Sequence, residues 1–219
     1  IPTSGSASIM VNIQEDMRKE TMEELEELKN KTLAKHSKLK ISCKSDFNVP
    51  SNSIIREVEK EEYDMIVLGT TGATGFKEIF LGSTVSSIID KVKLPILAVP
   101  LHSDFKEIDT ILMACSLESI KSVDSMNFIK LFATNMDLEV KFFNVFKDED
   151  TDFEKKLAKK KESLKIIFDS FKYDIDIIKS KDIEEAVLNA VENNQLLSVV
   201  TRERKFFDKM FHPSMSKKL

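Results

Sequence analysis

Long apolar runs and an excess of positive charge are both missing from this chain of 219 residues. Its longest apolar run, from Pro95 to Leu101, has the length of a strand, whereas a membrane span needs roughly 18 apolar residues. Lysine and arginine number 33 against 37 aspartates and glutamates, which gives a net charge of −4. Because phosphate contacts require a clustered positive surface, this balance argues against a nucleic-acid binder, and the short runs argue against a membrane protein.

Residues that build metal sites and nucleophilic centres are also few. The two cysteines, Cys43 and Cys115, lie far apart without metal-ligand spacing, and they suit a reducing cytosol. The three histidines, His36, His102 and His212, are scattered along the chain, so sequence neighbours assemble no metal or catalytic cluster. We therefore expect a cytoplasmic protein with no metal site and no catalytic residue, and with at most slow hydrolytic activity.

What is present is the balance of a globular protein, with 42% apolar and 32% charged residues. The length predicts one large domain or two small ones. Apolar spacing in the first half predicts alternating helices and strands. The helices are expected at residues 15–35, 51–60 with Ser51 as the cap, and 83–91; the strands are expected at 41–46, 65–68 and 95–99. The apolar run at 65–68 is typical of a strand buried on both faces, which indicates a parallel sheet.

The second half repeats this alternation after a polar stretch. Strands are expected at 109–114, 138–146, 174–179 and 196–200. Helices are expected at 123–135 and at 182–192, the latter with an acid at its start. A further amphipathic helix is expected where apolar residues recur at helical spacing, at Phe153, Leu157, Leu164, Phe168 and Phe171. Helices alternating with strands are typical of a doubly wound α/β fold, in which helices sandwich a parallel sheet. We expect a first domain at 1–101, a linker at 102–107 and a second domain at 108–219.

The two halves also match each other in order and spacing. Residues 41–45, a helix and residues 65–68 correspond to residues 177–180, a helix and residues 197–200, which suggests duplication. In this overlay the first copy lacks an initial strand–helix–strand, and the second lacks a last strand. We expect either that the sequence is a piece of a longer tandem protein, or that a partner chain supplies the missing strands, because an open slot would leave backbone groups unpaired.

Glycine is scarce, with five residues in all, yet four of them follow one strand within 14 residues. These four are Gly69, Gly72, Gly75 and Gly82. Glycine lets backbone N–H groups approach a ligand closely, and parallel α/β sheets bind ligands at the carboxyl ends of their strands. A helix N-terminus there favours phosphate, and Ser83 and Thr84 would add hydroxyl donors. The spacing fits neither the G-x-x-x-x-G-K-[ST] loop nor the dinucleotide fingerprint, and a simple connecting turn remains the alternative.

The sequence Gly69-Thr-Thr-Gly72, nine further residues and Gly82-Ser83, followed by Leu94-Pro-Ile-Leu-Ala-Val-Pro100, resembles the universal stress protein family. The resemblance implies a flavodoxin-like fold of the adenine nucleotide alpha hydrolase-like type, in two tandem copies. It also implies that ATP or another adenine nucleotide binds in the first domain, with or without Mg²⁺. The site residues implied are Leu68, Gly69, Thr70, Gly72, Gly82, Ser83, Thr84 and Val85.

Departures from the family pattern limit that expectation to the first copy. ATP-binding members of the family use an acidic residue at the end of their first strand and contacts after the second strand, and the first copy has neither element. At the matching strand end the second copy has 114–119 Ala-Cys-Ser-Leu-Glu-Ser, without an aspartate at the expected place. Its loop at 201–207 contains no glycine, so we expect no nucleotide in the second domain. The alternative is a nucleotide-free scaffold for dimerisation or protein interaction. In the family two domains pair through their last strands, which predicts pairing within the chain and a homodimer.

Overall fold

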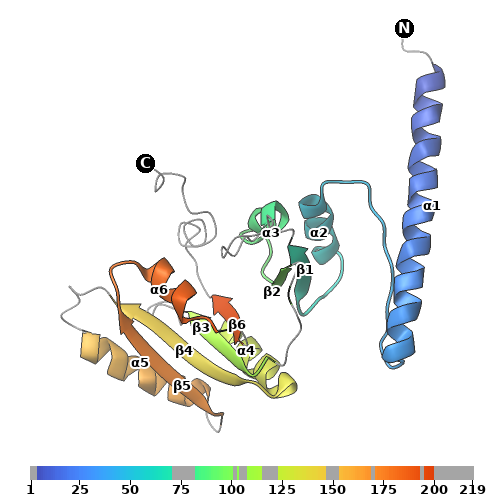
Figure 1. Ribbon diagram of the computed structural model, residues 1–219. Helices are drawn as coiled ribbons and strands as arrows, with labels where there is room; N and C mark the ends of the chain where they lie inside the picture. Colours follow the sequence, from blue (N-terminus) through green and yellow to red (C-terminus); the bar gives the residue numbers. More distant parts are fainter. Residues whose placement is uncertain are drawn as a thin grey trace. The chain divides into compact units, whose positions relative to one another are not determined.

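The computed structural model describes residues 4–70, 82–100, 103, 108–114, 123–146, 153–168, 171–192 and 195–199. Helices alternate with strands along these residues (Figure 1), and they flank parallel strands, which confirms the predicted α/β fold. The chain divides into two units, one of residues 1–67 and 83–97 and one of residues 68–82 and 98–219. The linker expected at 102–107 lies mostly outside the described residues and stays a prediction.

The first unit begins with a long helix, α1 (Ser4–Lys35), which includes the helix predicted at 15–35 and extends it. It continues through α2 (Pro50–Val58) to the start of β1 (Ile66–Thr70). After residues 71–81 come α3 (Gly82–Ile88) and β2 (Ile96–Pro100). Strands β1 and β2 pair in a two-stranded sheet, and the Ile66 N–H donates to the Pro95 carbonyl at 2.9 Å.

Three local predictions for this unit are wrong. Residues 41–46 form no strand, because a strand requires a hydrogen-bonded neighbour and the described residues supply none. Ser51 does not cap α2: Val49 occupies the cap position and Pro50 begins the helix, since the fixed φ of proline suits a first helical residue. Strand β1 is not buried on both faces, since Val67 is 55% exposed while Ile66 and Thr70 are buried.

The second unit contains a four-stranded sheet in the order β5-β4-β3-β6. Its strands are β3 (Thr110–Ala114), β4 (Glu139–Phe146), β5 (Tyr173–Lys179) and β6 (Gln195–Val199), and every described pair is parallel. The helices are α4 (Val123–Met136), α5 (Phe153–Ile167) and α6 (Ile183–Ala190). Figure 1 shows α4 and α5 on one face of this sheet and α6 on the other.

Alternating side chains of β3 and β4 build the main core of this unit, against α4 and α5. Ile111, Met113 and Phe142 from the strands pack with Met126 from α4 and Leu164 from α5, and all five are at most 2% exposed. The Phe142 ring meets the ring of Phe168 edge to face, with centroids 5.2 Å apart. Aromatic pairs of this kind add to the free energy of apolar burial.

Helix α6 begins as its sequence predicts. The Asp182 carboxylate accepts a hydrogen bond from the Glu185 N–H at 3.1 Å, which satisfies one of the free donors of the first turn. Val187 on this helix is 2% exposed. The cap therefore fixes where the helix begins, and Val187 anchors the helix to the unit.

Candidate functional site

The predicted site residues fall on two elements that flank residues 71–81. Leu68, Gly69 and Thr70 form the end of β1. Gly82, Ser83, Thr84 and Val85 form the start of α3. Gly72 lies outside the described residues, as does Gly75. The two described groups are therefore considered separately.

The end of β1 presents bare backbone at Gly69. A Cβ added to Gly69 would meet no heavy atom of the described residues within 4 Å, and the residue is exposed. Its neighbours are more enclosed: Thr70 is 5% exposed, and Leu68 is half-buried. Another molecule can therefore come close to the main chain at Gly69. Packing among the described residues does not itself require glycine at this position.

The start of α3 combines exposed hydroxyls with an apolar anchor. Ser83 is exposed and Thr84 is half-buried, while Val85 and Ile88 are 2% and 0% exposed. The Ser87 hydroxyl donates to the Ser83 carbonyl at 2.7 Å. Because the Val85 side chain is packed in the interior, it positions the helix, and only its backbone could face a ligand. The helix has seven residues, so hydroxyl and amide donors matter more here than a helix dipole.

In the second unit, the comparable edge of the sheet lies where β3 and β6 end. Ala114 pairs with Val199 in the register of these strands, and the strand order reverses between them, which is where α/β sheets bind ligands. Residues 115–119 and 201–207, on which the expected loss of this second site depends, lie outside the described residues. The absence of a second nucleotide site therefore stays a prediction.

Sequence reasoning missed a buried amide near that edge. Asn144 on β4 is 3% exposed, and its Nδ2 has no hydrogen-bond partner among the residues that the structure describes. The register places it one residue beyond Phe143, which pairs with the last residue of β3. A lone asparagine in the apolar run Phe143-Asn-Val145 was the available signal.

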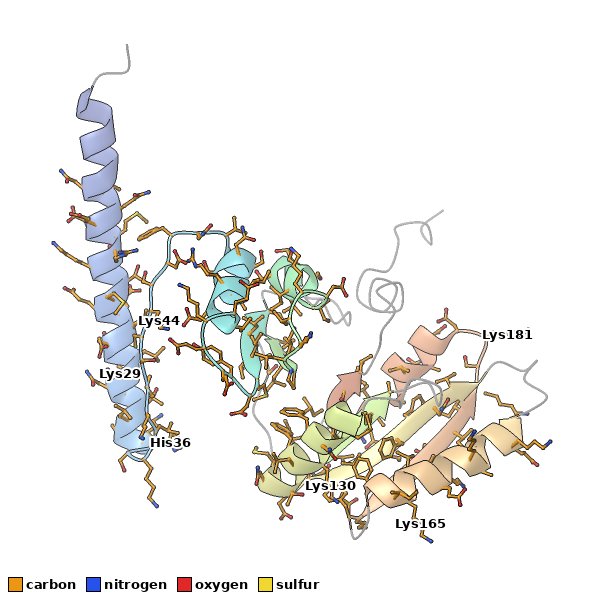
Figure 2. All side chains as sticks on the ribbon, turned by 180° about the vertical axis from the view of Figure 1, so that it is seen from behind. Lys29, His36, Lys44, Lys130, Lys165 and Lys181 are labelled. Carbon is orange, nitrogen blue, oxygen red and sulfur yellow. The ribbon has the colours of Figure 1, made fainter. Side chains whose placement is uncertain are left out.

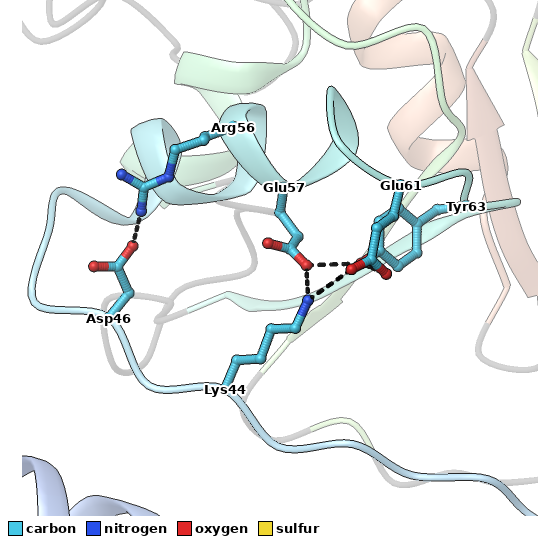
Figure 3. Close-up of polar contacts among 6 residues, drawn as sticks. All are labelled: Lys44, Asp46, Arg56, Glu57, Glu61 and Tyr63. Carbon is cyan, nitrogen blue, oxygen red and sulfur yellow. Dashed lines mark hydrogen bonds and ion pairs between the residues drawn. The ribbon is translucent and has the colours of Figure 1, made fainter.

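A second missed feature is a cluster of charged side chains that joins residues 44–46 to α2 and the residues after it (Figure 3). The Lys44 ammonium contacts the carboxylate of Glu57 and lies 3.2 Å from that of Glu61. The Tyr63 hydroxyl donates to Glu57 at 2.9 Å. The hydrogen bond from Lys44, followed by the one from Tyr63, lowers the pKa of Glu57 below its ordinary value.

A second ion pair adjoins this cluster, between Asp46 and Arg56, and the Ser53 hydroxyl also donates to Asp46 at 2.7 Å. Figure 2 shows Lys44 on the extended segment beside α1. Exposed ion pairs of this type contribute little stability one by one. Together they hold the extended segment against α2.

Two classes of site are absent from the described residues. No group of three or more histidine, cysteine, aspartate or glutamate side chains is placed to hold a metal ion there. No helix in the described part of the chain is long and apolar enough to cross a membrane. What the described residues do offer is an open main chain at Gly69 and, as a separate group, hydroxyl donors at Ser83 and Thr84.

Comparison with known proteins gives matches of sequence and of fold. Residues 2–100 match the model of the universal stress protein family. Universal stress protein MJ0531 of Methanocaldococcus jannaschii is 35% identical over 99 residues, which are 45% of this chain and 55% of that protein. Universal stress protein MJ0577 of the same organism is 39% identical over 51 residues, 23% of this chain and 32% of that protein. The matched part of the chain thus spans about half of the length of the first of these curated relatives and about a third of the length of the second.

A universal stress protein from Archaeoglobus fulgidus DSM 4304 has a similar structure, with a TM-score of 0.56 over 78% of this chain and 64% of that one. Its sequence identity of 19% supports likeness of fold alone. The sequence matches support assigning residues 2–100 to the universal stress protein family, and the fold of the chain agrees with that family.

Proposed function

We propose that the first domain binds an adenine nucleotide, ATP above all, next to the glycine-rich stretch that follows β1. The observation that carries the proposal is the open main chain at Gly69, at the end of a strand in the stretch that matches the family. Phosphates are anions, so exposed N–H and hydroxyl groups suit them. Ser83 and Thr84 supply hydroxyls, while Leu68, Thr70, Gly72, Gly82 and Val85 complete the proposed site.

The bound nucleotide would serve regulation in a stress response, with at most slow hydrolysis. The described residues offer no paired base and nucleophile at β1 or α3, and fast hydrolysis needs such a pair. Mg²⁺, where it accompanies ATP, would be held mainly by the phosphates, as is usual for this ion. We propose the cytoplasm as the compartment, and a homodimer as the assembly.

Calorimetric titration of the 219-residue chain with ATP tests this function, first on the unaltered protein and then on Gly69→Ala. A methyl group at Gly69 would clash with none of the residues that the structure describes, so loss of binding in a variant with unchanged circular dichroism reports on the ligand. We expect saturable binding that Gly69→Ala weakens at least about tenfold, the scale of 1.4 kcal/mol. Gly5→Ala, in α1, is the matched control and should bind as the unaltered chain does.

Absence of heat with ATP would contradict the proposal and favour a nucleotide-free scaffold instead. That second function has its own support, because eight of the large apolar side chains exposed in the described residues lie between Ile13 and Val67. Exposed apolar side chains of this size, where they adjoin, form the patches by which proteins bind partners. If Gly69→Ala and the unaltered chain bind ATP with equal affinity, the nucleotide does not bind next to β1.

A further inference from the structure

Helix α5 is strongly basic, although the chain as a whole has a net charge of −4. Its 15 residues contain six lysines, two glutamates and no arginine. Lys155, Lys161 and Lys165 are exposed, and none of them enters an ion pair within the part of the chain that the structure describes. The positive charge of this helix therefore faces solvent and is not neutralised by those residues.

The outer side of the same helix also carries an apolar side chain. Ile166 is 76% exposed, and it lies two residues from both Leu164 and Phe168, which are buried against the sheet. Successive residues of an α-helix are turned by about 100°, so Ile166 points away from that buried side. The helix therefore displays an isoleucine among its lysines.

Helix α4 adds a second apolar side chain next to these residues. Helices α4 and α5 contact each other on one face of the sheet, and Figure 2 shows Lys130 on α4 and Lys165 on α5. Leu131 on α4 is 62% exposed, so Ile166 and Leu131 are the two most exposed of the large apolar side chains in the described residues. The outer sides of the two helices, here called the α4–α5 face, thus combine the lysines of α5 with Ile166 and Leu131.

This combination suits an anionic lipid surface better than a protein or a nucleic acid. Protein interfaces are enriched in arginine and aromatic residues and depleted in lysine, whereas the cations of α5 are all lysines. The phosphates of a nucleic acid would attract the lysines, but they would leave Ile166 and Leu131 without an apolar neighbour. A bilayer offers both partners, because anionic headgroups attract lysine and the boundary of the acyl chains takes up aliphatic side chains.

We propose that the α4–α5 face binds the surface of a membrane that contains anionic phospholipids. Lys155, Lys161 and Lys165 contact the headgroups, while Ile166 and Leu131 enter the boundary between headgroups and acyl chains. The attachment is peripheral, so it needs no membrane-spanning helix. The apolar side of α5 stays in the core of its own unit, and the unit therefore binds in its folded state. This surface belongs to the second unit, and the proposal goes beyond nucleotide binding in the first domain.

Sedimentation of the 219-residue chain with lipid vesicles tests the proposal. We expect binding to vesicles of phosphatidylcholine and phosphatidylserine in equal parts, and none to vesicles of phosphatidylcholine alone. Exposed charges are screened beyond about 8 Å at physiological ionic strength, so binding should weaken as salt is added. Absence of binding to the phosphatidylserine vesicles, or equal binding to both kinds, would overturn the proposal.

Two charge-reversal variants locate the binding face. The double variant Lys155→Glu with Lys165→Glu should weaken binding to the anionic vesicles at least about twentyfold, since each lysine near such a surface contributes about fivefold. Its matched control is Lys35→Glu with Lys38→Glu, which changes the net charge equally at exposed lysines of the first unit and should bind nearly as the unaltered chain does. Equal loss in both variants would overturn the proposal, because net charge alone would then govern binding. Unchanged binding in the first variant would overturn it too, by placing the contact elsewhere on the chain.

A tryptophan probe distinguishes insertion into lipid from attraction to phosphate alone. The chain has no tryptophan, so Ile166→Trp introduces a single one on the α4–α5 face. Leu39→Trp is the control, at a position of the first unit that is 51% exposed. On the anionic vesicles the emission of Ile166→Trp should shift to the blue, and that of Leu39→Trp should stay unchanged. Absence of the shift in Ile166→Trp would overturn the proposal, and so would a preference of the chain for duplex DNA over the vesicles. None of these outcomes depends on nucleotide binding.

Discussion

Replacement of Asn144 by leucine tests the energetic consequence of the buried amide in the second unit. The side chain is 3% exposed and its Nδ2 has no partner within the described part of the chain, so folding removes this donor from water without compensation from those residues. Such a group costs about 1–3 kcal/mol, whereas an apolar replacement of similar size removes that cost. Imperfect packing of leucine at a strand position offsets part of the gain. We expect Asn144→Leu to raise the free energy of unfolding of this unit by about 1–2 kcal/mol.

The assay is urea unfolding followed by tyrosine fluorescence. The chain has no tryptophan and two tyrosines, Tyr63 and Tyr173, so a Tyr63→Phe background leaves a single probe in the second unit. The Tyr173 ring lies 5.8 Å from that of Phe142, and it therefore reports on the packing next to Asn144. Asn144→Ala, which removes the amide but leaves a gap, should gain less. A loss of more than about 1 kcal/mol in Asn144→Leu would refute the reasoning, because it would show that Nδ2 has a partner in solution.

Three further predictions concern the core, a helix cap and a titrating group. In the same urea assay, Phe168→Ala should lower the free energy of unfolding by about 3–5 kcal/mol, because the ring is 1% exposed and its loss leaves a cavity; a loss below about 1 kcal/mol would contradict that packing. Asp182→Ala should cost about 1 kcal/mol through the lost cap of α6, and Asp182→Asn should restore most of it. The carboxyl of Glu57, followed by carbon NMR, should titrate below the ordinary value of about 4.3 and return toward it in Lys44→Met. Since that pKa is lowered by folding, the stabilising contact is complete above about pH 4.3 and is lost as the pH falls through the folded-state pKa; an unchanged midpoint in Lys44→Met would contradict the contact.

Elements with strong apolar periodicity or clear end signals could be predicted from the sequence. The helix expected at 123–135 corresponds to α4 (Val123–Met136), and the acid expected at the start of α6 is its cap. The alternation at 41–46 predicted a strand, but pairing depends on a neighbour elsewhere in space and is not written in the segment itself. For the same reason, the apolar run at 65–68 could not reveal that Val67 stays exposed.

The sequence predicted the candidate site only through its unusual local content of glycine, and not through its geometry. Four glycines within 14 residues of a chain with five point to a special loop. That a side chain at Gly69 would meet none of the described residues depends on what surrounds β1 in space, which the sequence does not give. Asn144 was overlooked because its neighbours, Phe143 and Val145, make the strand look uniformly apolar. The cluster around Lys44 joins residues up to 19 positions apart, beyond the reach of any local pattern.

The uneven distribution of the apolar core has a practical consequence for handling the protein. Of the 17 buried apolar residues in the described part of the chain, 14 lie between Ile111 and Val187. A protease added in small amounts should therefore cut first among residues 12–65, and leave a resistant fragment from the later part of the chain. On heating, the earlier part of the chain should likewise unfold before the later part. A single melting temperature would therefore describe neither part. Storage conditions under which the later part of the chain stays folded could still leave residues 12–65 open to proteolysis.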